Sequence, residues 1–375
     1  MYQESKTQPG LFLLVFFVIG LITVGCEGGK TQTSSSSKET TDTVKEYKYY
    51  ADWAVNTEYL QQGCESGYDC IKSIDNPKFT TLTEATLMQD EDLVVGIKIG
   101  DVVRCYPHRI LDWHEMVNDV IGDKKFTINY CPLTGSAMAW NRVVNGKETT
   151  FGVSGLLFNS NVIPYDRETG SHWSQMKQQC VNGEFFRQKI ECYQIVETTW
   201  KTWKQLYPGS QVQSFETGHS RHYDQYPYFD YKENEEVMFD VEFDNDTLFQ
   251  KERLFGIIDA GSRQNEKVKC YRFDNFKNGV TVLEDSVFGK KIVLIGSKQD
   301  NFITAFENNL NGTQLKLKPV SNTLPAICSD ENGNLFDVFG NCIEGSLKGA
   351  QLKQVDGFIA YWFAWAAFYP EAEVY

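Results

Sequence analysis

The sequence predicts an α+β fold that is rich in β-strand, with two tandem pseudo-symmetric repeats packed together and each ending in a Trp-rich helix. The first observation is the pattern Trp-x-x-Trp-x-x-x-Tyr-Pro, which starts at Trp200 and again at Trp362. The second is that other paired blocks precede each copy in the same order, such as Cys-x-x-Gly at Cys180 and at Cys342. Chance similarity between aromatic strands would not keep one order, and repeats of this length indicate a duplicated domain rather than a solenoid.

The pairing of blocks divides the chain into six segments. They are a lipoprotein signal peptide (1–26), a flexible Ser/Thr-rich tether (27–46), an N-terminal segment (47–92), repeat 1 (93–213), an acidic aromatic connector (214–253) and repeat 2 (254–375). Repeat 1 keeps polar residues that repeat 2 lacks, so we expect the functional site in repeat 1 and a scaffold in repeat 2.

Hydrophobic periodicity predicts that repeat 1 begins with strands and ends with a helix. Residues 93–106 hold Val and Ile around a Gly-Asp turn, which predicts a hairpin. Further strands are expected at 125–130 and 149–159. An amphipathic helix is expected at 198–207, where Pro208 ends it.

The equivalent helix of repeat 2, at 362–369, is nearly all apolar. It is too short to span a bilayer and is therefore expected to be buried. The Trp residues of both helices are interpreted as core residues rather than as a ligand-binding box.

Composition bounds the class of protein. The chain has 375 residues, of which 41% are hydrophobic and 14% aromatic, enough for a substantial core. Its formal net charge is −14 and no Lys/Arg cluster offsets it, so we expect no nucleic-acid partner.

The first 26 residues predict export. Residues 11–23 form an apolar run of signal-peptide length, and Thr23-Val24-Gly25-Cys26 follows. A small residue before a Cys resembles the lipobox of bacterial lipoproteins, which implies that Cys26 is lipidated and anchors the protein to a membrane. The alternative is an uncleaved anchor helix; both place the bulk outside the cytoplasm. Glu27 favours the outer membrane or cell surface, since Asp is the residue that commonly retains lipoproteins at an inner membrane.

Cysteine counting follows from export to an oxidising compartment. Ten Cys less Cys26 leave nine, an odd number, so at least one thiol is left unpaired. Cys64 and Cys70 are close enough for a local disulfide.

Several blocks between roughly 70 and 375 resemble the bacterial domain-of-unknown-function 3179 family. The matching blocks are Ile74-Asp75-Asn76-Pro77-Lys78-Phe79, Cys105-Tyr106-Pro107, Trp113-His114-Glu115-Met116-Val117-Asn118-Asp119, Tyr130-Cys131-Pro132-Leu133-Thr134-Gly135-Ser136, Phe151-Gly152-Val153-Ser154-Gly155, Tyr165-Asp166-Arg167-Glu168-Thr169, Trp173-Ser174-Gln175 and Trp362-Phe363-Ala364-Trp365-Ala366-Ala367-Phe368. The resemblance implies an envelope setting and supplies no reaction. Many relatives have a second Cys where this chain has Thr134, so a dithiol redox role is not expected.

Cys131 is the centre of the predicted site. It is expected to end a strand before a turn, where backbone N–H groups can lower the pKa of a thiol. His114 is its expected base, oriented by Glu115 or Asp119, so these four are the candidate catalytic residues. Each also has a structural interpretation: a disulfide half or inert thiol, a core histidine, and capping groups.

A second group is expected to bind substrate. It comprises Asn118, Ser136, Asp166, Arg167, Trp173 and Gln175. The segment 165–169 is also good turn chemistry, which is its structural interpretation.

Three functions remain open from the sequence. One is thiol-based enzyme chemistry at Cys131 and His114. Another is a copper or zinc site with the same two residues as ligands. The third is a non-catalytic ligand-binding or structural lipoprotein, whose small-molecule or protein ligand is unknown. Phosphate-binding, zinc-protease and nucleophile-elbow motifs are absent from the sequence.

Overall fold

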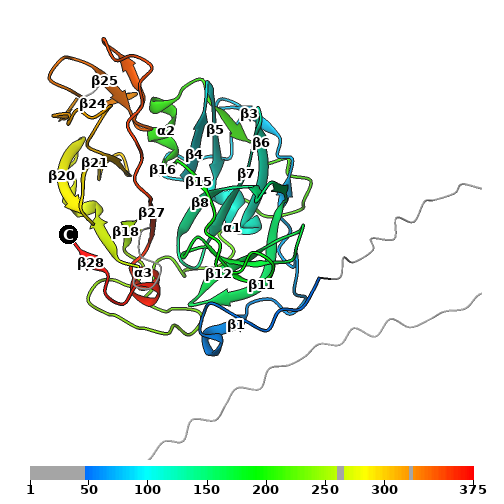
Figure 1. Cartoon of the computed structure of the whole chain (residues 1–375). Coiled ribbons are helices and arrows are strands. Elements are labelled where there is room, and N and C mark those ends of the chain that lie inside the picture. Colours follow the sequence, from blue (N-terminus) through cyan, green and yellow to red (C-terminus); the bar gives the residue numbers. More distant parts are fainter. Residues whose placement is uncertain (1–46, 260–265, 321–323) are drawn as a thin grey trace, which may run out of the picture. The chain divides into compact units, whose positions relative to one another are not determined.

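Strands dominate the computed structural model, which describes residues 47–259, 266–320 and 324–375 (Figure 1). The described chain forms one unit that begins at Tyr47. Its α-helices have seven residues each: α1 (His108–His114), α2 (Trp200–Leu206) and α3 (Trp362–Phe368). Two short 3-10 turns, η1 (Thr57–Tyr59) and η2 (Phe273–Asn275), complete the helical part. The prediction of a β-rich α+β class is confirmed.

The first half contains three five-stranded sheets and a small hairpin. Sheet C has the order β16 (Ile195–Thr199), β4 (Leu93–Ile99), β5 (Val102–Pro107), β17 (Gln211–Gln213), β3 (Phe79–Thr81). Sheet B has the order β15 (Cys192–Tyr193), β8 (Ser136–Asn141), β7 (Lys124–Cys131), β6 (Met116–Ile121), β2 (Ile74–Asp75). Sheet A has the order β1 (Leu60–Gln62), β11 (Phe151–Phe158), β12 (Asn161–Asp166), β13 (His172–Ser174), β14 (Gln179–Asn182). The hairpin pairs β9 (Val143–Val144) with β10 (Lys147–Glu148).

The second half contains three smaller sheets. Sheet E has the order β27 (Gly357–Tyr361), β18 (Arg253–Ile258), β19 (Val268–Arg272), β28 (Glu373–Val374). Sheet F has the order β20 (Thr281–Val287), β21 (Lys290–Ser297), β22 (Phe302–Glu307). Sheet H has the order β23 (Lys318–Pro319), β24 (Ala326–Ser329), β25 (Leu335–Asp337), β26 (Cys342–Glu344).

Sheets C and E share one pattern of pairing. In each sheet the two central strands form an antiparallel hairpin, β4–β5 in sheet C and β18–β19 in sheet E. The strand that precedes the helix, β16 or β27, pairs antiparallel with the first hairpin strand. The strand that follows the helix, β17 or β28, pairs parallel with the second hairpin strand. The helix lies close against the sheet: a Cβ on Gly96 would stand 2.0 Å from Trp203, and one on Gly256 2.4 Å from Trp365. Glycine is therefore required where each Trp crosses its sheet.

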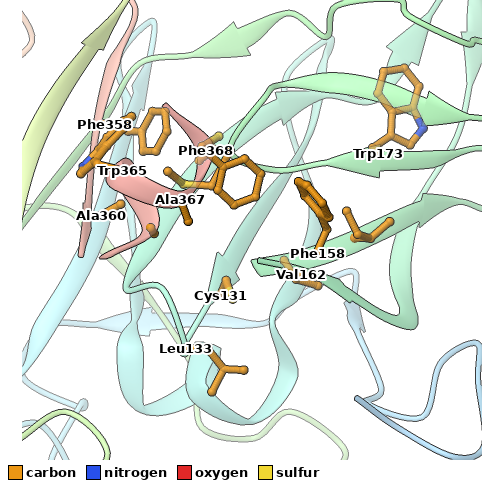
Figure 2. Close-up of a cluster of buried hydrophobic side chains, with 14 of the residues drawn as sticks. Cys131, Leu133, Phe158, Val162, Trp173, Phe358, Ala360, Trp365, Ala367 and Phe368 are labelled. Carbon is orange, nitrogen blue, oxygen red and sulfur yellow. The ribbon is translucent and has the colours of Figure 1, made fainter. Parts of the chain in front are cut away.

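The core connects the halves reciprocally. The side chains of α3 belong to the cluster that includes Trp140 and Trp173 of the first half, whereas those of α2 belong to the cluster that includes Phe302 and Phe336 of the second. Figure 2 shows Phe368 of α3 beside Phe158 of β11, with ring centroids 5.3 Å apart. Each helix therefore lies in a core to which both halves contribute, between its own sheet and side chains of the other half.

Several local predictions are confirmed. The hairpin expected at 93–106 is β4–β5. The strand expected at 125–130 lies within β7, and the one expected at 149–159 contains β11. Helix α2 begins at Trp200 because the side chain of Thr199 accepts from the backbone N–H of Thr202. Helix α3 is buried throughout.

The predicted Cys64–Cys70 disulfide is present. The signal peptide, Cys26 and the tether lie outside the described residues. Among the helices of the described residues, none combines the length and apolar character needed to cross a membrane.

Candidate functional site

His114, at the end of α1, holds the connector in place. Its Nδ1 lies 2.6 Å from the carbonyl of Lys72 and its Nε2 2.7 Å from the hydroxyl of Tyr223. Burial lowers the pKa of His114 to about 4, so the ring is neutral. Nδ1 therefore carries the proton and Nε2 accepts from Tyr223. Both nitrogens are used, and neither reaches Cys131.

Cys131 is a buried free thiol at the end of β7. Its Sγ lies 3.7 Å from the carbonyl of Ser160, and the Figure 2 view places it beneath α3. Burial and the nearby charge of Glu115 raise the pKa of Cys131 to about 11, although hydrogen bonds from Thr134 and Val162 oppose this. The turn after β7 does aim donors at the sulfur, as its sequence suggests, but burial outweighs them.

Glu115 is the unusual member of the predicted group. It has a φ of 57°, a region that a glutamate rarely adopts, and its side chain is buried. Burial raises the pKa of Glu115 to about 8, against the hydrogen bond that Tyr228 donates to it over 3.5 Å. Its backbone N–H ends α1 by donating to Leu111. Strain and a protonated carboxyl thus occur together beside Cys131.

Asn118 and Asp119 join elements of the first half. The amide of Asn118 makes a two-way pair with the backbone of Phe151, at 2.8 and 2.9 Å. Asp119 accepts from Tyr106 at 2.6 Å and from Arg104 at 2.8 Å. Both side chains are fully used within the fold.

Ser136 and Gln175 belong to a buried polar network. The hydroxyl of Ser136 donates to Gln175 at 2.6 Å, and the amide of Gln175 donates to Asn129 at 2.9 Å. Asn161 donates to Gln175 and to Thr134 at 2.7 and 2.9 Å. These side chains pair with one another behind the turn that follows β7, except that Nδ2 of Asn129 is buried without a partner among the described residues.

Asp166 and Arg167 belong to the predicted turn, which Trp173 of β13 contacts. Asp166 accepts from the backbone N–H of Thr169 at 2.8 Å and from the indole of Trp173 at 3.1 Å, and Trp173 is fully buried. Arg167 pairs with Asp69 at 2.6 Å and so holds the N-terminal segment. The structural interpretation of this block agrees with its contacts.

The structure brings no metal-binding set together. Within the described part of the chain, no three His, Cys, Asp or Glu side chains are grouped so that they could hold a metal ion. Cys131 and His114 have separate partners, so the pairing expected for copper or zinc is not what the geometry shows.

A cavity of about 410 Å³ lies where the connector crosses the start of α1; we call it the connector pocket. Its residues come from the segment before β4, from α1 and from the connector. They are Glu91, Asp92, Leu93, His108, Arg109, Asp112, Tyr223, Asp224, Gln225, Tyr226, Phe229, Lys232 and Glu233. Its rim is acidic and its wall aromatic.

His108 is the most unusual residue of this pocket. It is 4% exposed, and neither ring nitrogen makes a hydrogen bond to a described residue. Its Nε2 lies 3.3 Å from Oε2 of Glu197, at ion-pair distance but outside hydrogen-bond geometry. Burial would raise the pKa of Glu197, but the charges of Arg253 and His108 hold it below its ordinary value. A buried carboxylate thus faces one side of the imidazole.

Asp112 and Tyr226 complete the floor and wall. Asp112 is buried, and burial raises the pKa of its carboxyl against the attraction of Lys232, whose Nζ lies 3.3 Å from both carboxylate oxygens. The hydroxyl of Tyr226 is buried without a hydrogen-bond partner among the described residues. Unpaired buried polar atoms are costly, so their presence at a cavity is informative.

Sequence reasoning missed His108, Asp112 and Glu197. His108 directly follows the Cys105-Tyr106-Pro107 block, and that position is the only local signal. Glu197 of β16 reaches His108 through tertiary structure, and Arg253 of β18 pairs with Glu197. No spacing in the sequence indicates this cluster.

The family model described as "Protein of unknown function (DUF3179)" matches residues 68–372. The chain belongs to this family. The resemblance stated from the sequence blocks is thereby confirmed. No curated protein and no solved structure matches the chain. The description of the family names no reaction.

Proposed function

We propose that this protein is an exported lipoprotein that binds a small polar ligand in the connector pocket. One observation carries the binding proposal: His108 and the Tyr226 hydroxyl are buried at a 410 Å³ cavity without hydrogen-bond partners among the described residues. A ligand that supplies partners recovers the free energy that these groups cost the empty protein. Cavities of this size suit small molecules.

The contacts of the predicted residues favour binding over thiol chemistry. Cys131 is a buried thiol of raised pKa, and His114 has no free nitrogen to activate it. His108, by contrast, makes no hydrogen bond to a described residue and lies in the pocket lining, where a ligand can contact it.

Substitution of Tyr226 tests the pocket. Tyr226→Phe removes an unpaired hydroxyl, so we expect the thermal midpoint of the ligand-free whole chain to stay equal or rise. Ligands found by nuclear magnetic resonance with a mixture of polar fragments should bind the variant about tenfold more weakly, the cost of one hydrogen bond. Tyr193→Phe, in β15 outside the pocket, is the matched control. Equal binding by wild type and Tyr226→Phe would contradict the proposal.

The lipid anchor has its own test. Export and lipidation rest on the apolar run and on Thr23-Val24-Gly25-Cys26. Cells fed a radioactive fatty acid should label the protein, and Cys26→Ser should lose the label and the membrane fraction. Label on Cys26→Ser would exclude this site of lipidation.

We also infer that the two halves are copies of one unit. Sheets C and E share their pairing, and the tyrosine–carboxylate pair Tyr106–Asp119 has a counterpart in Tyr271–Asp285, with oxygen distances of 2.6 and 2.7 Å. The position equivalent to His108 is Phe273, the residue that follows the second strand of each hairpin. This comparison supports a binding role for the first half alone.

A further inference from the structure

The connector pocket already contains one ammonium group, that of Lys232. Its Nζ lies 3.3 Å from both oxygens of Asp112 and 3.9 Å from the ring centroid of Tyr226. A carboxylate beneath an ammonium and an aromatic face beside it form a typical binding site for an organic cation. The protein fills this site with its own side chain.

Lys232 is held more loosely than a comparable lysine nearby. Lys251 also lies 3.9 Å from a tyrosine ring, that of Tyr231, but it is 4% exposed and donates to Asn234 at 2.7 and 2.9 Å. The side chain of Lys232 is 34% exposed, and its contacts with Asp112 are long for a charge-assisted hydrogen bond. A ligand can therefore displace Lys232 at lower cost than Lys251.

The rim carries negative charge that the chain does not neutralise. Glu91, Asp224 and Glu233 are exposed, line the pocket, and form no ion pair with a described residue. The floor holds Asp112, and the buried His108 offers a ring nitrogen without a hydrogen bond. One carboxylate at the floor and three at the rim suit a ligand that carries more than one positive charge.

The connector also has a strained residue at this pocket. Phe229 has a φ of 56°, a backbone conformation that is unfavourable for a bulky residue. Its side chain is 90% exposed. Strain of this kind occurs at ligand clamps.

We propose that the ligand of the connector pocket is a linear polyamine, whose terminal ammonium replaces that of Lys232 between Asp112 and the Tyr226 ring while its other ammonium groups pair with the rim carboxylates. This inference rests on the proposed function and names its ligand class. Lys232 then acts as an internal competitor, so the apparent affinity is reduced by the fraction of molecules in which it occupies the site.

Calorimetry on the whole purified chain tests this proposal with spermidine, with putrescine and with 1,4-butanediol as the neutral match to putrescine. We expect both amines to bind and the diol not to bind. Lys232→Met keeps the stem but removes the competing charge, so it should bind spermidine about tenfold more tightly. Lys353→Met, which breaks the exposed Lys353–Glu307 ion pair outside the pocket, is the matched control and should leave the affinity unchanged.

Asp112→Asn should lose most of the binding of both amines. Because a buried substitution can disturb folding, the gain of affinity in Lys232→Met is the decisive result, since misfolding cannot produce it. Amine binding that is unchanged in both variants would overturn the displacement. If only neutral or anionic fragments bind, and bind more weakly to Tyr226→Phe, the polyamine inference fails while the proposed function stands; if nothing binds, both fail.

Discussion

At the scale of single residues, Glu115 carries two costs at once. Its backbone lies in the left-handed region, and its carboxyl group is buried next to Asp112 and Cys131. Residues of this kind persist only where the surrounding structure over-determines them. Glu115 has such support: its N–H ends α1 and its carbonyl accepts from the N–H of Tyr130.

The raised pKa of Glu115 predicts a pH dependence of stability. The folded carboxyl titrates at about 8 and the unfolded one at its ordinary value of 4.5. Between these values the folded state binds the extra proton, so the free energy of unfolding falls as pH rises and is level above about pH 8. Glu115→Gln should remove this slope. It should match wild type near pH 4 and exceed it near pH 9 by up to a few kcal/mol, at about 1.4 kcal/mol per pKa unit.

Urea denaturation at a series of pH values checks this. Glu344→Gln, an exposed position on β26, is the control and should follow wild type throughout. Parallel curves for wild type and Glu115→Gln would show that Glu115 does not titrate in this range.

Single residues were also where the sequence was least informative about the site. Cys131 could be singled out because it is expected to precede a turn, and Glu115 because it stands next to His114 in a distinctive block. Their burial, which decides their chemistry, depends on α3 and on the connector, both far away in the sequence. His108 could not be found at all, because Glu197 meets it, and Arg253 meets Glu197, only in the folded chain.

At the scale of elements, the connector is a strap of aromatic side chains that covers α1. The hydroxyl of Tyr223 donates to His114, and Tyr228 reaches Glu115. The hydroxyl of Tyr231 donates to the carbonyl of Leu133 at 2.9 Å. The sequence predicted an acidic aromatic connector. Its contacts with the predicted site could not be predicted, since residues 214–252 contain no helix or strand to orient them.

Tyr223→Phe should loosen this strap. The change leaves Nε2 of His114 and the hydroxyl of Thr217 without their shared partner, at a cost of about 1–3 kcal/mol for a buried unpaired group. We expect faster cleavage within 214–253 in limited proteolysis and a lower denaturation midpoint. Tyr193→Phe, on β15, should cleave at the wild-type rate. A Tyr223→Phe connector that resists protease as well as wild type would show that this hydrogen bond does not hold it.

At the scale of the whole molecule, the last helix of each half packs on its own sheet and also against the core of the other half. The hydroxyl of Tyr369 donates to the carbonyl of Met176 in the first half, and that of Tyr207 donates to Asp337 in the second, both over 2.9 Å. The repeated Trp pattern correctly predicted two buried helices. The pattern could not indicate the contacts of each helix with the other half, because a hydrophobic face can be buried against the core of either half.

Phe368→Ala should therefore destabilise the first half, although Phe368 belongs to the second half in sequence. Removal of a buried Phe costs about 3–5 kcal/mol. Hydrogen exchange should accelerate first in β11, which contains Phe158, and in its neighbour β12, rather than in β20 and β21. Tyr207→Ala is the reciprocal variant, and it should accelerate exchange in β25, beside Asp337 and Phe339. Faster exchange confined to each variant's own half would contradict the reciprocal arrangement.

The packing of α3 against the first half also determines when, during synthesis, the core of the first half can be completed. A ribosome makes residues 93–213 first, and they emerge while the seven residues of α3 are still to be translated. The core around Trp140 and Trp173 stays open until α3 has been translated, and the outer face of α2 stays uncovered until the sheets of the second half have formed. A nascent chain interrupted before α3 therefore exposes apolar surface in both halves, where proteases and chaperones can recognise it.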